Sequence, residues 1–156
     1  FIPAQKGKTH VLHIIRELLS FEPSSTGTDI AQALQYFSNA QKRHCTAFLI
    51  SDFIGVEGLE KPLMIASNRH EVNAIQIYDR RETELPNVGL VKFHDAETGQ
   101  DVWVDTAIAS VREQYASEWK QNQSRIEQLC TKTGVKRMSV RTDEDYVKAL
   151  MKLFKS

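Results

Sequence analysis

The sequence predicts an α/β fold, in which helices cover both faces of a largely parallel, Rossmann-like sheet as a three-layer sandwich. Nearly continuous apolar runs at residues 45–50, 72–78 and 135–140 are typical of strands that are buried on both faces. Segments with apolar side chains at helical spacing lie before, between and after these runs. Strands that alternate with helices in this way pair in parallel, and their right-handed crossovers place helices on both faces.

Length and composition favour one domain over residues 1–156. The chain has 20 basic and 20 acidic residues, and this balance argues against a nucleic-acid partner, which favours basic domains. No apolar run approaches the ~20 residues that cross a bilayer, so we expect no membrane contact by this segment. Cys45 and Cys130 lie far apart, and we expect two reduced, buried thiols of a cytoplasmic protein.

The first quarter of the chain predicts two helices. Residues 8–20 carry a broad apolar stripe at helical spacing. Thr28 or Asp29 can cap a second helix that runs to about residue 41. The apolar positions that we expect to face inward on this second helix are Ile30, Leu34 and Phe37.

The middle of the chain predicts a third helix and a β-hairpin insertion. Pro62 suits the first turn of a helix over residues 63–70, because proline lacks an N–H that this turn does not need. Strand-like runs at residues 88–93 and 102–104 flank a short polar loop that contains Gly99. Two such runs around a glycine-bearing loop indicate a hairpin.

The last third of the chain predicts a long helix over residues 107–133, which Gly134 ends, and a short final helix. Thr142 and Asp145 have the spacing of a capping box at the start of the final helix. We expect Trp103, in the hairpin, to belong to the core. The positions of the long helix that we expect to face inward are Ile108, Val111, Tyr115, Trp119, Ile126 and Leu129.

Candidate site residues follow two of the predicted strands and precede one helix. Asp52 and Asp79 come directly after strands, and ligands of open α/β sheets bind outside the carboxyl ends of the strands. Thr28 and Asp29 stand at a helix start, and oxygen ligands of this kind can hold a hard cation such as Mg²⁺. Each also has a simpler interpretation: Thr28 as an N-cap, Asp52 as the start of a turn, and Asp79 as the partner of a neighbouring arginine or helix N-terminus.

Several strings of the sequence resemble one protein family. The strings TGTDI at residues 26–30 and FLISDF at residues 48–53 resemble two of the three metal-site loops of von Willebrand factor A-like domains. Further strings are similar to one bacterial branch of that superfamily, the functionally uncharacterised family encoded beside MoxR-type AAA+ ATPases. These strings are HEVNAIQIYD at residues 70–79, ELPNVG at 84–89, DAETG at 95–99 and SVRTDEDYV at 139–147.

The resemblance implies a metal-ion-dependent adhesion site, with Thr28 as the hydroxyl ligand of the second loop and Asp52 as the carboxylate of the third. The family's first loop, Asp-x-Ser-x-Ser, does not occur in this sequence, and its place in the family is before Phe1. We therefore expect the C-terminal part of such a domain, without the first central strand. Mg²⁺ is expected for the complete protein and not for this chain, because Mg²⁺ requires near-octahedral oxygen coordination.

The resemblance also implies a function, a non-enzymatic adaptor for protein–protein interaction whose partner is a MoxR-type AAA+ ATPase or its client. Without the first strand, residues 44–51 form an apolar sheet edge, and we expect the chain to form a homodimer through it. The alternative function is a metal-dependent phosphohydrolase or nuclease that uses strand-end carboxylates. Such sites need several converging acids, and the sequence offers Asp52 and Asp79.

Overall fold

The computed structural model describes residues 2–22, 27–94 and 99–153. Residue 26 of the TGTDI string and residues 95–98 of the predicted hairpin loop lie outside these ranges. The elements in chain order are α1 (Lys8–Ser20), α2 (Ile30–Ala40), β1 (Thr46–Ser51), α3 (Glu60–Ser67), β2 (Glu71–Tyr78), α4 (Arg80–Thr83), β3 (Leu90–His94), β4 (Asp101–Asp105), α5 (Ala109–Thr133), β5 (Lys136–Arg141) and α6 (Tyr146–Leu153).

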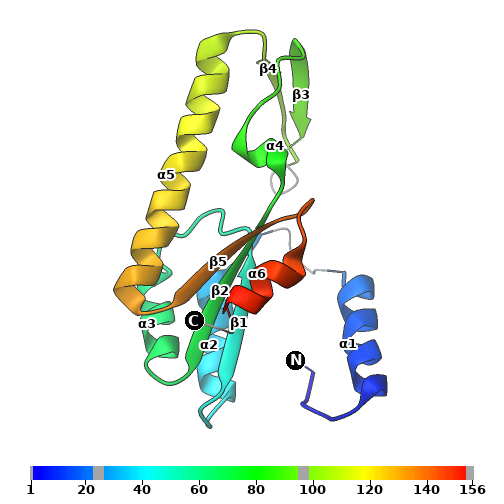
Figure 1. Cartoon of the computed structure of the whole chain (residues 1–156), viewed down its shortest axis with the longest axis vertical. Coiled ribbons are helices and arrows are strands. Elements are labelled where there is room, and N and C mark those ends of the chain that lie inside the picture. Colours follow the sequence, from blue (N-terminus) through cyan, green and yellow to red (C-terminus); the bar gives the residue numbers. More distant parts are fainter. Residues whose placement is uncertain (1, 23–26, 95–98, 154–156) are drawn as a thin grey trace.

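The predicted α/β class is confirmed by a three-stranded sheet in the order β1-β2-β5, in which both pairs are parallel. β2 is the central strand, and β1 stands at one edge of the sheet. In register, Ile50 of β1 lies beside Ile75 of β2, and Ile75 lies beside Met138 of β5. Crossovers through α3 and through the long segment that contains α5 connect the three strands, as parallel pairing requires (Figure 1).

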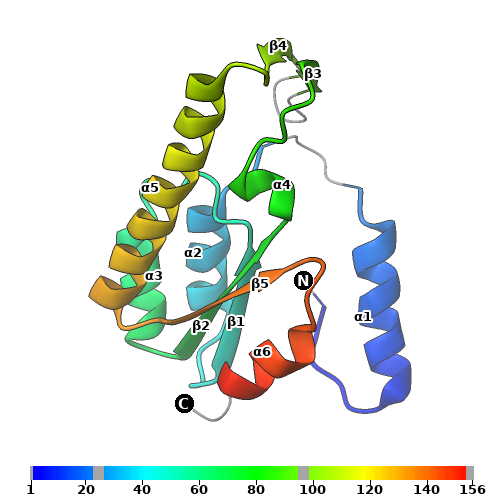
Figure 2. The same ribbon diagram turned by 45° about the horizontal axis from the view of Figure 1, so that its top comes forward.

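One face of the sheet carries the main core. Helices α2, α3 and α5 lie on this face, whereas α6 and α1 lie on the other (Figure 2). The core joins buried residues of all three helices to side chains of β1 and β2 that point toward them. Its buried apolar residues include Leu34, Phe53, Leu63, Ala66, Val72, Ala74, Ile126 and Cys130.

The other face of the sheet is covered only in part. Helix α6 packs over Ile75 and Val140 with Ala149 and Leu150. The expectation that the first strand is buried on both faces is wrong, because the β1 residues alternate between exposed and half-buried, and Ile50 is 59% exposed. None of the residues of α1 is buried. Helices thus lie on both faces of the sheet, and the described residues leave part of this second face uncovered.

The predicted hairpin is confirmed as a separate antiparallel pair, β3 and β4, beside the N-terminal half of α5 (Figure 1). Trp103 is 62% exposed, so its expected place in the core is wrong. Trp119 is half-buried, and its ring packs 5.1 Å from that of Tyr78, centroid to centroid. Ile108, expected to face inward, is 49% exposed, since α5 rests on the sheet only along its second half.

The helix ends confirm one capping prediction and correct another. Asp29, one of the two predicted candidates, is the N-cap of α2, and its carboxylate accepts a hydrogen bond from the backbone N–H of Gln32 at 2.8 Å. Thr142 does not take part in a capping box with Asp145, because its hydroxyl donates to the carboxylate of Asp79 at 3.0 Å. None of the helices in the described ranges combines the length and the hydropathy that a bilayer crossing requires.

Candidate functional site

The two predicted site loops lie at the same edge of the sheet. β1 ends at the edge where α2 begins, so the residues just before α2 and just after β1 are neighbours in the fold (Figures 1 and 2). Parallel β1 and β2 end at this same edge, which is the carboxyl edge of the sheet. This is the position at which open α/β sheets bind their ligands.

Thr28 is not needed as the cap of α2, because Asp29 has that role. The carboxylate of Asp29 satisfies the first turn of α2, so the alternative role of Thr28 as the N-cap is not needed. The side chain of Thr28 is exposed. A threonine hydroxyl in this position can donate or accept a hydrogen bond and can serve as an oxygen ligand.

Asp52 begins a tight turn that its own carboxylate stabilises. Its Oδ1 accepts hydrogen bonds from the backbone N–H of Ile54 at 3.1 Å and from the hydroxyl of Ser51 at 3.3 Å. The Ser51 hydroxyl oxygen in turn accepts from the N–H of Phe53 at 3.0 Å. The turn interpretation of Asp52 is therefore confirmed, and the carboxylate remains exposed.

The next residue, Phe53, anchors this turn in the core. Phe53 has a φ of 56°, in the left-handed region that bulky residues avoid, and its side chain is fully buried. Two side-chain amides hold the backbone carbonyls of the turn: Gln76 Nε2 donates to Asp52 O at 3.2 Å, and Asn122 Nδ2 donates to Phe53 O at 3.3 Å. The surroundings thus fix a strained backbone, an arrangement that is frequent at functional sites.

Gln76 connects the turn to a polar network beneath α5. Its side chain is 0% exposed, and its Oε1 accepts hydrogen bonds from Arg137 Nη2 at 2.7 Å and from the Ser139 hydroxyl at 3.1 Å. Arg137 also donates to the side-chain oxygen of Gln123 on α5. This network was not predicted from the sequence. A glutamine within the apolar run of β2 was the available signal, since a buried amide requires partners.

Both carboxylate oxygens of Asp79 accept hydrogen bonds from other residues of the chain. It is the N-cap of α4, where its Oδ1 accepts from the N–H of Arg81 at 2.8 Å and its Oδ2 accepts from the Thr142 hydroxyl at 3.0 Å. The backbone hydrogen bond from Arg81, followed by the bond from Thr142, lowers the pKa of this carboxyl below its ordinary value. The predicted pairing with a helix N-terminus is confirmed.

The described residues do not by themselves fit a magnesium site. Mg²⁺ takes six oxygen ligands in near-octahedral geometry, and Thr28 and Asp52 offer two. Across residues 2–22, 27–94 and 99–153, no group of three or more His, Cys, Asp or Glu side chains is placed to hold a metal ion. Any metal at this edge needs further ligands from elsewhere.

The cysteines lie away from the carboxyl edge. Both are free thiols, but Cys45 is only half-buried, which corrects its expected burial, whereas Cys130 is buried. Burial raises the pKa of the Cys130 thiol. Cys45 Sγ lies 3.6 Å from Nδ1 of His70, at the opposite end of the sheet from Asp52.

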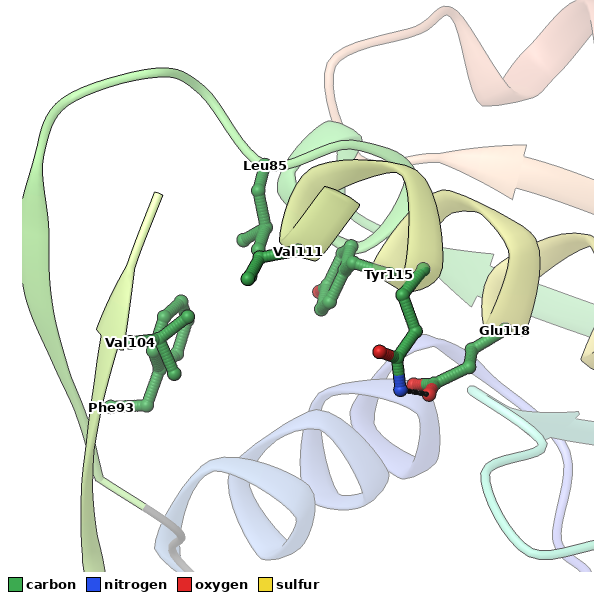
Figure 3. A pocket seen from close by; sticks show the side chains of 7 residues that line it. Leu85, Phe93, Val104, Val111, Tyr115 and Glu118 are labelled. Atoms are coloured by element: carbon green, nitrogen blue, oxygen red, sulfur yellow. Dashed lines mark hydrogen bonds between the residues drawn. The ribbon is translucent and has the colours of Figure 1, made fainter. Parts of the chain in front are cut away.

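An apolar hollow lies between the hairpin and α5. It measures about 250 Å³ and is lined by the apolar side chains of Leu85, Phe93, Val104 and Val111 and by Tyr115. Figure 3 shows Phe93 and Val104 of the hairpin facing Val111 and Tyr115 of α5. Burial, and then the nearby Glu82 and Glu118 carboxylates, raise the pKa of the Tyr115 phenol. This hollow is a second surface on which a partner's apolar side chain can be received.

Comparison with known proteins places the chain in a family. A protein of unknown function in Mycobacterium avium is 29% identical, over 99% of this chain and 92% of that protein. Uncharacterised proteins of Mycobacterium tuberculosis and Mycobacterium bovis are 30% identical over 99% of this chain, which spans 49% of their length. No solved structure matches. The model of the family described as protein of unknown function DUF58 matches residues 1–125, so the chain belongs to the DUF58 family.

Proposed function

We propose that this chain is part of a non-enzymatic, cytoplasmic adaptor of the von Willebrand factor A type, and that the carboxyl edge of its sheet binds a protein partner. The partner that the sequence resemblance suggests is a MoxR-type AAA+ ATPase or its client. The observation that supports the proposal most directly is the shared position of the α2 N-terminus and the β1 C-terminus at one edge (Figure 2). That arrangement brings the loops of Thr28 and Asp52 together.

The rigidity of the Asp52 turn is a second support. A carboxylate that must meet a partner in one orientation benefits from a backbone that does not have to be ordered on binding. Four hydrogen bonds fix this turn: the side-chain oxygens of Ser51 and Asp52 each accept one from a backbone N–H, and the side-chain amides of Gln76 and Asn122 each donate one to a backbone carbonyl. The buried Phe53 ring prevents the turn from swinging outward. In this proposal Thr28 and Asp52 supply two oxygens of a metal-dependent adhesion site, and the sequence resemblance assigns the other ligands to the family's first loop.

Partner binding tests the proposal through a matched pair of variants. Asp52→Asn keeps the turn, because asparagine also accepts from the N–H of Ile54, but it removes the charge. We expect Asp52→Asn to weaken binding of the full-length protein to its MoxR-type ATPase in Mg²⁺ by at least about tenfold, or ~1.4 kcal/mol. The control is Asp79→Asn, which neutralises an acid at the end of the next strand and should bind like the wild type. Equal affinity of Asp52→Asn and wild type would contradict the proposal.

A second candidate function is a metal-dependent phosphohydrolase or nuclease. One observation favours it, namely that Asp52 and Asp79 follow two strands that pair side by side. Both oxygens of Asp79 already accept hydrogen bonds, however, which leaves less capacity for a metal. Turnover of a generic phosphodiester with Mn²⁺ or Mg²⁺ that Asp52→Asn and Asp79→Asn both abolish would favour this second function over the adaptor.

A further inference from the structure

A cysteine and a histidine meet at the amino edge of the sheet. Cys45 Sγ lies 3.6 Å from Nδ1 of His70, within reach of a weak hydrogen bond between the thiol and the ring. Cys45 directly precedes β1 and His70 directly precedes β2. Because parallel strands begin at the same edge of a sheet, the pairing of β1 with β2 brings the two side chains together.

The positions of both residues are fixed by contacts within the fold. The Cys45 carbonyl accepts a hydrogen bond from the Glu71 N–H at 3.0 Å. The His70 N–H donates to the carbonyl of Ala66 in α3 at 2.9 Å. The His70 ring packs against the ring of Phe37 in α2, with 4.8 Å between the ring centroids. The sulfur and the imidazole are therefore held together by α2, α3 and the starts of β1 and β2.

His70 is buried, yet its side chain contacts only one polar group, the thiol. The residue is 3% exposed, and within the described residues its Nε2 has no hydrogen-bond partner. Buried polar atoms normally have partners, so this unpaired nitrogen calls for an explanation. A nucleophile and a base within hydrogen-bond reach are the arrangement that activates a cysteine. The buried imidazole aimed at Cys45 thus points to acid–base chemistry on that sulfur.

The charged groups around the pair do not engage His70. α2 carries no charged side chain, and the acidic residue of α3 is in its first turn, at the far end from His70. Arg69 donates to the Ser38 carbonyl at 3.2 Å, and the Glu71 carboxylate accepts from the hydroxyl of Thr46 at 3.1 Å. The exposed residues just before Cys45 are Lys42, Arg43 and His44. No described carboxylate therefore competes with the thiol for the imidazole.

The reaction that suits this pair is oxidation of the thiol by hydrogen peroxide. Cys45 is half-buried, and hydrogen peroxide is a small reagent. In the tautomer that carries its ring proton on Nε2, the Nδ1 atom of His70 can accept the thiol proton. As that proton moves, the sulfur attacks one peroxide oxygen, an S–O bond forms and the O–O bond breaks. The leaving hydroxide takes the proton from His70 and becomes water.

We propose that Cys45 and His70 form a site of peroxide oxidation, with Cys45 as the modified residue and His70 as its general base. The sulfur loses two electrons and becomes a sulfenic acid, while the peroxide is reduced to water. A low-molecular-weight thiol reverses the change: it condenses with the sulfenic acid to a mixed disulfide and water, and a second thiol releases Cys45. The site is independent of the proposed adaptor surface, which lies at the carboxyl edge.

Oxidation of the reduced, full-length protein tests the proposal. Hydrogen peroxide is added at about pH 7 together with dimedone, which traps sulfenic acid, and peptide mass spectrometry measures the trapping rate at each cysteine. We expect Cys45 to be trapped at least about tenfold faster than Cys130, which is 4% exposed and whose thiol pKa is raised by burial. A Cys45 rate no higher than the Cys130 rate would overturn the proposal.

Two variants test the role of the imidazole. His70→Phe keeps a ring against Phe37 but accepts no proton, and His70→Asn keeps a polar side chain that is not a base. Both should lower the Cys45 trapping rate at least about tenfold. The matched control is His44→Phe, which removes an exposed imidazole beside Cys45 and should react like the wild type. If His70→Phe and His70→Asn also react like the wild type, His70 is not the base and the proposal fails.

The same assay at about pH 10 separates an acid–base role of His70 from a structural one. A cysteine thiol ionises without a base near pH 8.5, so at about pH 10 the reaction no longer needs the imidazole. The wild type and both His70 variants should then react at equal rates. A deficit of the variants that is as large at about pH 10 as at about pH 7 would show a structural role only and would refute the proposed base.

Discussion

The two faces of the three-stranded sheet carry similar apolar side chains but differ in what covers them. Leu49 and Ile50 are neighbours on β1, yet Leu49 packs into the main core under α2 whereas Ile50 is 59% exposed. On the closed face, three helices meet β1 and β2. On the open face, the described residues of α6 pack over Ile75, Met138 and Val140. The comparison teaches that an apolar strand shows its potential for burial, while the covering elements decide which residues are buried.

The largest expected difference between the faces is in stability. Leu63, on α3, is 0% exposed in the main core, and Leu63→Ala should lower the free energy of unfolding by about 2–5 kcal/mol, since it leaves a cavity. Ile50→Ala on the open face should change it by about 0.5 kcal/mol or less in dilute solution. Urea denaturation of both variants measures the two values. Similar losses for both would show that the open face is covered within one chain.

A smaller loss is expected from the polar network under the closed face. Gln76→Leu removes the donor to the Asp52 carbonyl and the acceptor of Arg137, and should cost about 1–3 kcal/mol by leaving buried polar groups unpaired. Ser139→Ala, which removes one donor to the same Gln76 oxygen, is the control and should cost less. If the two variants unfold at the same urea concentration, the network does not stabilise the turn.

At the carboxyl edge, the ionisation of Asp79 makes the stability of the fold depend on pH. The pKa of Asp79 is lowered from its ordinary value of 3.8, so its stabilising contribution is complete above pH 3.8 and is lost as the pH falls through the lower pKa of the folded state. Asp79→Asn lacks this titration. We expect the wild type to exceed the variant in stability near neutral pH and the difference to shrink as the pH falls below 3.8. A difference that is constant with pH would contradict the assignment.

The smallest effect is expected at α1. Leu18 is 73% exposed, so Leu18→Ala should change the stability of the dilute chain by less than about 0.5 kcal/mol. The equivalent change on α2, Leu34→Ala, removes a side chain that is 5% exposed and should cost several times more. Thermal unfolding at low protein concentration compares the two variants. A large loss for Leu18→Ala would mean that α1 packs against the rest of its own chain.

The sequence predicted the elements better than their burial. The hairpin, α5 and the three strands were predicted because periodicity and glycine positions are local signals. The burial of Ile50 and Ile108 was predicted wrongly, because burial depends on elements far away in the chain. Asp52 was found from its place after a strand. Phe53, Gln76 and Asn122, which hold the Asp52 turn, were missed because their contacts join β1, β2 and α5 across long stretches of sequence.

Helix α5 contributes residues to both candidate surfaces, the hollow beside the hairpin and the carboxyl edge of the sheet. Val111 lines the hollow beside the hairpin, and Asn122 holds the Phe53 carbonyl. The two residues are eleven positions apart, which is about three helical turns, so they share one side of the helix at a spacing of about 16 Å. An uninterrupted helix keeps that spacing constant. An interface of ordinary size, about 800 Å² per partner, is wide enough for one binding protein to contact both surfaces at the same time.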